Sequence, residues 1–145
     1  MKEKFIRAYM DVAQRFAELS YAKRLHVGAI VVKDDRIISI GYNGMPAGWD
    51  NNCEFECVHP QTKIPELVTR PEVLHAERNA LDKLAKGNEG GQGSTMFVTH
   101  APCLECAKSI YGAGISSIYY RDSYRSDDGI QFLANCGVNV KKLSN

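Results

Sequence analysis

The stretch Val98-Thr-His-Ala-Pro-Cys-Leu-Glu-Cys-Ala107 decides the fold, because it joins a short buried-looking segment directly to a helix-forming one. Residues 96–100 are mostly apolar or β-branched, which predicts a strand. Pro102 suits the start of a helix, since the N–H that it lacks would be unpaired there. The stretch therefore predicts a strand followed at once by a helix that runs to about Tyr111.

Strands and helices continue to alternate on both sides of this stretch. Residues 73–86 have helical periodicity and precede Gly87, a residue common after a helix C-terminus. Further on, residues 116–120 predict a strand, about 127–135 a helix and 138–143 a last strand. Repeated strand–helix units favour parallel strands with helices on both faces of the sheet.

The first half of the chain predicts a different arrangement. Residues 3–19 repeat apolar side chains at helical spacing. Two β-branched runs, 27–33 and 36–42, flank Asp34-Asp35 and predict a β-hairpin. Residues 43–72 contain several glycines and prolines and little periodicity. We expect no regular structure there, and a loop of this length is more often functional than idle.

Length and composition indicate an ordinary globular protein, expected to form one domain over residues 1–145. Apolar residues make up 44% of the chain and charged residues 24%, and the net charge of +1 suggests no polynucleotide partner. No apolar run reaches the roughly 20 residues that span a bilayer. The N-terminus lacks the apolar core of a signal peptide, so we expect a cytoplasmic protein without a membrane partner.

The five cysteines argue for metal binding or catalysis, because an odd number in a reducing compartment does not suit a disulfide framework. Cys103 and Cys106 are three residues apart on a predicted helix, so both can reach one ion. Thiolates suit zinc, and a helix N-terminus favours the thiolate form. With His75 they make three ligands, which leaves a fourth tetrahedral position for water, as in a catalytic site.

Glu77 follows His75 by two residues and is predicted to move protons around a zinc-activated water. A lone Cys-x-x-Cys is also found in redox pairs and structural zinc sites. The combined pattern, His-x-Glu followed by Pro-Cys-x-x-Cys, is the signature of zinc nucleobase deaminases. The sequence therefore favours a catalytic zinc over these alternatives.

These motifs and the order of the elements resemble the cytidine deaminase superfamily, and within it the deoxycytidylate (dCMP) deaminases. The resemblance covers nearly the whole chain, and the stretch Gly41-Tyr-Asn-Gly-Met-Pro-Ala-Gly48 with the long loop after it narrows the match. The other matching segments are Arg24–Val31, His75–Ala80, Val98–Ala107 and Ile115–Tyr120, with Tyr124 and Arg125 following. The resemblance implies a three-layer α/β/α sandwich around a five-stranded mixed sheet.

The resemblance also implies hydrolytic deamination of dCMP to dUMP with release of ammonia, with one zinc per chain. The activated water would attack C4 of the base, and Glu77 would protonate N3 and then the departing amine. Asn43 would contact the sugar, and Arg24 and Tyr124 are candidates near the phosphate. Alternatively, Arg24 is a solvated surface charge and Tyr124 is a half-buried packing residue. The base pocket would comprise Ala76, Thr99, His100, Ala101 and Pro102.

Regulation is implied by analogy alone. Similar enzymes are hexamers that dCTP activates and dTTP inhibits, with Mg²⁺ accompanying the triphosphate. Asn43, Gly44, Met45 and Asn52 would contribute to that effector site.

A second, structural zinc is a further possibility, held by Cys53, Cys57 and His59 with His26 or His100 as a fourth ligand. The alternative is that both cysteines are free thiols.

Other functions were weighed against dCMP deamination. A tRNA adenosine deaminase would need a larger basic surface. A deaminase of free cytidine would not need the Gly41–Gly48 stretch or a phosphate-binding arginine, and dCTP is a further candidate substrate. A zinc-stabilised interaction module would need no Glu77.

Overall fold

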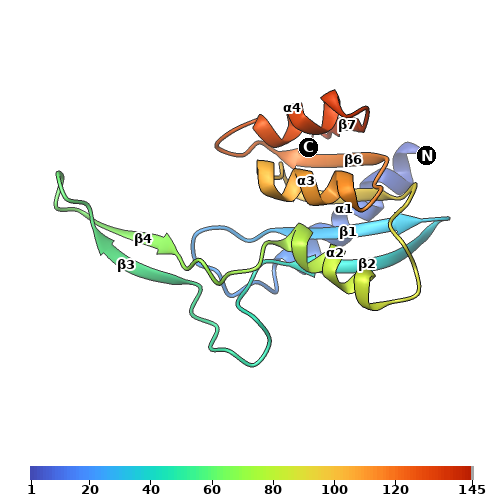
Figure 1. Ribbon diagram of the computed structural model, residues 1–145. Helices are drawn as coiled ribbons and strands as arrows, with labels where there is room; N and C mark the ends of the chain where they lie inside the picture. The colour runs from blue at the N-terminus through green and yellow to red at the C-terminus, as the bar shows by residue number, and fades with distance from the viewer. Residues whose placement is uncertain (145) are drawn as a thin grey trace.

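The computed structural model describes residues 1–144 and shows three layers, with a sheet between helices (Figure 1). Its elements follow the chain in the order α1 (Glu3–Ala17), β1 (Gly28–Lys33), β2 (Arg36–Tyr42), β3 (Glu54–Val58), β4 (Pro65–Thr69), α2 (Ala76–Lys86), β5 (Thr95–His100), α3 (Leu104–Gly112), β6 (Ser117–Asp122), α4 (Asp128–Asn135) and β7 (Asn139–Lys142).

The central sheet has five strands in the order β2-β1-β5-β6-β7. Strand β1 is antiparallel to both of its neighbours, whereas β5, β6 and β7 are parallel to one another. The predicted mixed five-stranded sheet is thus confirmed. The parallel pairs arise where helices α3 and α4 connect successive strands, because a parallel connection needs a crossover.

Two hydrophobic cores lie on opposite faces of the sheet. Alternate residues of β1 supply both, since successive side chains of a strand point to opposite faces. Ile30 and Val32 pack with residues of α1, whereas Ala29 and Val31 join the core under α2, α3 and α4. Gly28 lets α1 approach closely, because a Cβ there would lie 2.0 Å from the carbonyl oxygen of Ala13.

The predicted hairpin of β1 and β2 turns at Asp34-Asp35. Both residues have positive φ, at 51° and 59°. A two-residue loop needs left-handed backbone at both positions to follow the twist of its strands, and aspartate tolerates it better than most residues.

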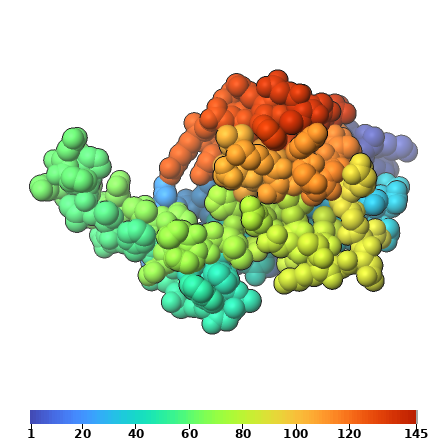
Figure 2. Space-filling view, viewed as in Figure 1, coloured from blue at the N-terminus to red at the C-terminus, as the bar shows by residue number. Residues whose placement is uncertain are grey.

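The expectation that residues 43–72 lack regular structure is wrong in part. Strands β3 and β4 pair antiparallel in a separate two-stranded sheet, which projects from the body as an arm (Figures 1 and 2). Most of its side chains are exposed. A strand without a buried face carries no clear apolar alternation, which explains why the sequence pattern missed it.

Two helices begin later than predicted. Helix α2 begins at Ala76, after an extended His75, and α3 begins at Leu104, after an extended Cys103. Among residues 1–144, no helix is both long enough and apolar enough to cross a membrane.

Candidate active site

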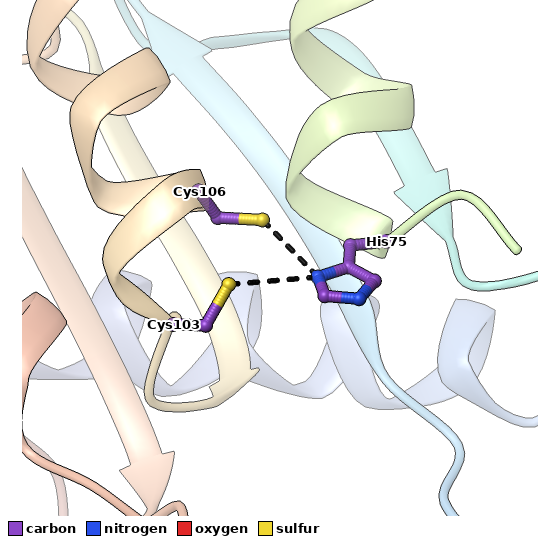
Figure 3. Close-up of side chains that lie close together, drawn as sticks. All are labelled: His75, Cys103 and Cys106. Atoms are coloured by element: carbon purple, nitrogen blue, oxygen red, sulfur yellow. Dashed lines mark hydrogen bonds between the residues drawn. The ribbon is translucent and has the colours of Figure 1, made fainter. Parts of the chain in front are cut away.

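Three side chains meet where two helices begin. His75 and Cys103 are the N-cap residues of α2 and α3, and Cys106 lies in the first turn of α3. The Nδ1 atom of His75 lies 3.3 Å from Sγ of Cys106 and 3.7 Å from Sγ of Cys103 (Figure 3). Ligand atoms of all three residues lie within 4.8 Å of one another. The structure therefore brings the predicted ligand set together.

These distances fit one zinc ion. Zinc bonds of about 2.3 Å to sulfur and about 2.05 Å to nitrogen, at tetrahedral angles, would separate a nitrogen and a sulfur ligand by about 3.5 Å. The two observed separations, 3.3 and 3.7 Å, lie on either side of that value. Two thiolates and one imidazole also match the softness of zinc.

Mutual hydrogen bonding shifts the pKa values of the two thiols in opposite directions. A hydrogen bond from Cys106, and a second from His75, lower the pKa of Cys103 to about 3. The same hydrogen bond to Cys103, together with burial, raises the pKa of Cys106. A metal that needs both thiolates would therefore displace the proton of Cys106.

Glu77 lies in the first turn of α2 and is only 4% exposed. Burial raises the pKa of its carboxyl group to about 7, because desolvation disfavours the charged form. A carboxyl group with this pKa can both hold and release a proton near neutral pH.

A cavity of about 450 Å³ opens beside His75 and Glu77. Six of the predicted substrate-binding residues line it: Arg24, Asn43, Ala76, His100, Ala101 and Tyr124. Their roles remain predictions, but their placement around one cavity agrees with them.

Thr99 and Pro102 do not line the cavity, contrary to the predicted base pocket, because both are fully buried behind its wall. The hydroxyl oxygen of Thr99 accepts a hydrogen bond from the N–H of Gly28 and lies 3.0 Å from Nδ1 of His100. Thr99 thus contacts the His100 ring through its hydroxyl group.

His100 lines the cavity. Burial lowers its pKa, and this effect outweighs the opposing influence of the Asp122 carboxylate. The Nε2 atom of His100 lies 3.6 Å from Oδ2 of Asp122.

Asn43 holds the chain that leads into β1. Its amide oxygen accepts the N–H of Val27 and its amide nitrogen donates to the carbonyl oxygen of Leu25, both at 2.8 Å. These bonds fix the wall of the cavity beside Arg24. The predicted contact of Asn43 with a sugar stays a prediction.

Several cavity residues were not among the predicted site residues. The polar ones among them are Glu54, Thr69, Asp122, Ser123 and Arg125. Arg125 directly follows Tyr124 and could have been found by that proximity. Glu54 and Thr69 lie on β3 and β4, in the region where no regular structure was expected, so no sequence pattern pointed to them.

A second cavity, of about 290 Å³, is lined mainly by residues 42–49. Of the predicted effector-site residues, Asn43, Gly44 and Met45 line it, together with Trp49 and Lys83. Asn52 does not line it, although Asn51 does.

The structure does not bring Cys53, Cys57 and His59 together, so the suggested second zinc site is wrong for residues 1–144. Within residues 1–144, the sole group of three or more side chains that could bind one metal ion is His75, Cys103 and Cys106. Cys53 is buried and Cys57 exposed, and the three residues between them belong to the extended strand β3, which places the two cysteines about 13 Å apart. The Nδ1 atom of His59 accepts N–H groups from its own turn.

Residues 3–122 match the family model described as the cytidine and deoxycytidylate deaminase zinc-binding region. The chain belongs to this deaminase family. The predicted resemblance is therefore confirmed.

The chain is similar to curated proteins over most of its length, two of which are as follows. ComE operon protein 2 of Bacillus subtilis is 35% identical over 93% of this chain and 69% of its own length. The deoxycytidylate deaminase of Saccharomyces cerevisiae is 32% identical over 94% of this chain, but the chain spans only 44% of that protein.

A solved deaminase structure closely matches the fold. The dCMP deaminase of cyanophage S-TIM5, in complex with dCMP and dUMP, is 45% identical, with a TM-score of 0.89 over 99% of both chains. This likeness confirms the predicted cytidine-deaminase-like fold.

Proposed function

We propose that this protein is a zinc-dependent deaminase that converts dCMP and water into dUMP and ammonia. The observation that carries the proposal is that His75, Cys103 and Cys106 can reach one ion, and that His75 and Cys103 line the same cavity as the buried Glu77. The 45% identity with the dCMP deaminase of cyanophage S-TIM5 supports dCMP as the substrate.

His75, Cys103 and Cys106 would hold the zinc. Zinc in such a site supplies Lewis acidity, which makes water nucleophilic near neutral pH. Glu77 would take a proton from the attacking water and deliver it to N3 of the cytosine ring. It would then take the proton of the new hydroxyl group on C4 and pass it to the amine, which leaves as ammonia while C4 becomes a carbonyl. Its raised pKa suits both tasks, because an effective proton shuttle has a pKa near the working pH.

Two arginines line the cavity and suit the 5′-phosphate. A guanidinium of Arg24 donates to the hydroxyl oxygen of Thr69 at 3.2 Å, so a neutral partner holds it in place. Among residues 1–144, neither Arg24 nor Arg125 forms an ion pair with a carboxylate. Their charge is therefore available to an anion, and the hydroxyl of Tyr124 adds a third donor nearby.

Ammonia release tests this function directly. Zinc-loaded protein is expected to deaminate dCMP with a kcat/KM at least about tenfold above that for cytidine, because one charge-assisted hydrogen bond contributes about 1.5–3 kcal/mol. A matched series of dCMP, dCTP and cytidine in one coupled assay measures the preference. Equal rates on cytidine and dCMP would contradict dCMP as the preferred substrate and favour a deaminase of free cytidine.

We also propose that a nucleoside triphosphate regulates the enzyme from the second cavity, with Mg²⁺ neutralising its phosphates. Lys83 and Trp49 support this idea, since a cation and an aromatic ring suit a phosphate and a base. We expect dCTP with Mg²⁺ to raise the rate at low dCMP and dTTP to lower it. A rate-versus-dCMP curve that neither nucleotide changes would remove the regulatory proposal.

The same protein is proposed to form a hexamer. Exposed large apolar side chains support self-association, and those on the arm are Phe55, Val58, Ile64 and Leu67.

A further inference from the structure

Glu54 is the first residue of β3 and lies where the projecting arm joins the body. It is only 4% exposed, whereas the four residues that follow it on the strand are all exposed. Glu54 also lines the large cavity, between Arg24 and Thr69 in the fold. A buried carboxyl group at this position needs an explanation, because charged side chains are rarely buried without partners.

One oxygen of this carboxylate is satisfied and the other is not. Oε2 accepts hydrogen bonds from the backbone N–H groups of Lys23 and Arg24, at 2.9 and 3.0 Å. Oε1 is buried and has no hydrogen-bond partner in the described part of the chain. No described lysine, arginine or histidine forms an ion pair with Glu54.

The nearby cation does not fill this gap. The guanidinium of Arg24 donates to Thr69 instead, even though the backbone of Arg24 contacts Glu54. A buried acceptor without a donor destabilises the protein, more so when it is charged. Oε1 is therefore suited to a hydrogen-bond donor that a ligand brings into the cavity.

The chemistry of dCMP leaves one group for this position. Its hydrogen-bond donors are the amine on C4 and the 3′-hydroxyl of the sugar. The amine must lie at His75 and Glu77, where it is replaced. The 5′-phosphate is mostly a dianion at neutral pH, so it accepts rather than donates and is repelled by a carboxylate. The 3′-hydroxyl remains.

We propose that Oε1 of Glu54 accepts a hydrogen bond from the 3′-hydroxyl of the bound nucleotide, which restricts the site to nucleotides with a free 3′-hydroxyl. This inference rests on the proposed deamination of dCMP. Within a polynucleotide, the 3′-oxygen is esterified to a phosphate, so it has no proton to donate and carries a charge that Glu54 repels. Glu54 thus selects mononucleotides over strands.

The test compares dCMP with 2′,3′-dideoxycytidine 5′-monophosphate, which lacks only the 3′-hydroxyl. For the unmodified protein, kcat/KM is expected to fall about 10- to 100-fold with the dideoxy nucleotide, the range for a hydrogen bond to a charged group. In Glu54→Gln, the ratio of kcat/KM for dCMP to kcat/KM for the dideoxy nucleotide is expected to shrink to less than about tenfold. The amide oxygen of glutamine can still accept the N–H groups of Lys23 and Arg24, so the wall should keep its shape.

Glu56→Gln is the matched control, because Glu56 is exposed on the same strand, and its ratio should equal that of the unmodified protein. Equal kcat/KM for the two nucleotides with unmodified protein would overturn the inference, whether or not any variant folds. An undiminished ratio in Glu54→Gln would overturn it too. Absence of dCMP turnover would instead refute the proposed function, and the inference would fall with it.

Discussion

Glu77→Gln is expected to leave one zinc per chain in place and to lower the turnover of dCMP by at least about 10²- to 10⁴-fold. The amide has nearly the same shape as the carboxyl group, so the buried site beside His75 should keep its geometry. It cannot accept a proton from water or return one to the base. Zinc analysis by atomic absorption and steady-state kinetics on the same sample measure both effects.

Glu105→Gln provides a matched control for this prediction. Glu105 also lies in the first turn of a helix that carries ligands, but its side chain is 76% exposed and pairs with Lys108 on the surface. Its removal should change neither zinc content nor turnover appreciably, because exposed pairs of this kind contribute little. A zinc-loaded Glu77→Gln protein with normal turnover would exclude Glu77 from the chemistry.

Patterns in the sequence predicted the central sheet well, because each strand there has at least one buried face. The residues of β1 and β5 are almost all buried, so their apolar runs show plainly in the sequence. The crossovers through α3 and α4 follow from chain order, since parallel neighbours must be joined in this way.

The arm shows the limit of such patterns. Strands β3 and β4 hold each other by backbone hydrogen bonds and bury little side-chain surface. Nothing in the alternation of their residues separates them from a loop. The arm also carries Glu54 into the cavity, so missing the arm meant missing this residue.

The cluster of candidate metal ligands was predictable because its placement depends on local structure. His75 and Cys103 each occupy the N-cap position of a helix, and Cys106 lies one turn further along α3. Thr99 and Pro102 were misplaced for a different reason. Whether a residue near a strand end faces a cavity or the core depends on how other elements pack on the two faces of the sheet. A short sequence motif contains no information about that packing.

Cys106→Ser is expected to lower the zinc content from one per chain to nearly none and to abolish turnover. The serine oxygen is a harder and far less acidic ligand than a thiolate, so it does not replace sulfur at zinc. The helix should still form, because Ala107 and Ile110 of α3 keep their places in the core. The melting temperature should lose its dependence on added zinc, since a metal stabilises the folded protein only if it binds there.

Cys57→Ser is the control for Cys106→Ser. It tests whether zinc is lost because a ligand of the proposed site is removed or because any cysteine is replaced. Cys57 is exposed on the arm and belongs to no cluster of potential ligands in residues 1–144. The variant should bind one zinc per chain, as the unmodified protein does, and keep full turnover. Two zinc ions per chain in the unmodified protein, one of them lost with Cys57, would restore the second metal site. Full zinc content in Cys106→Ser would instead show that His75 and Cys103 hold the ion without it.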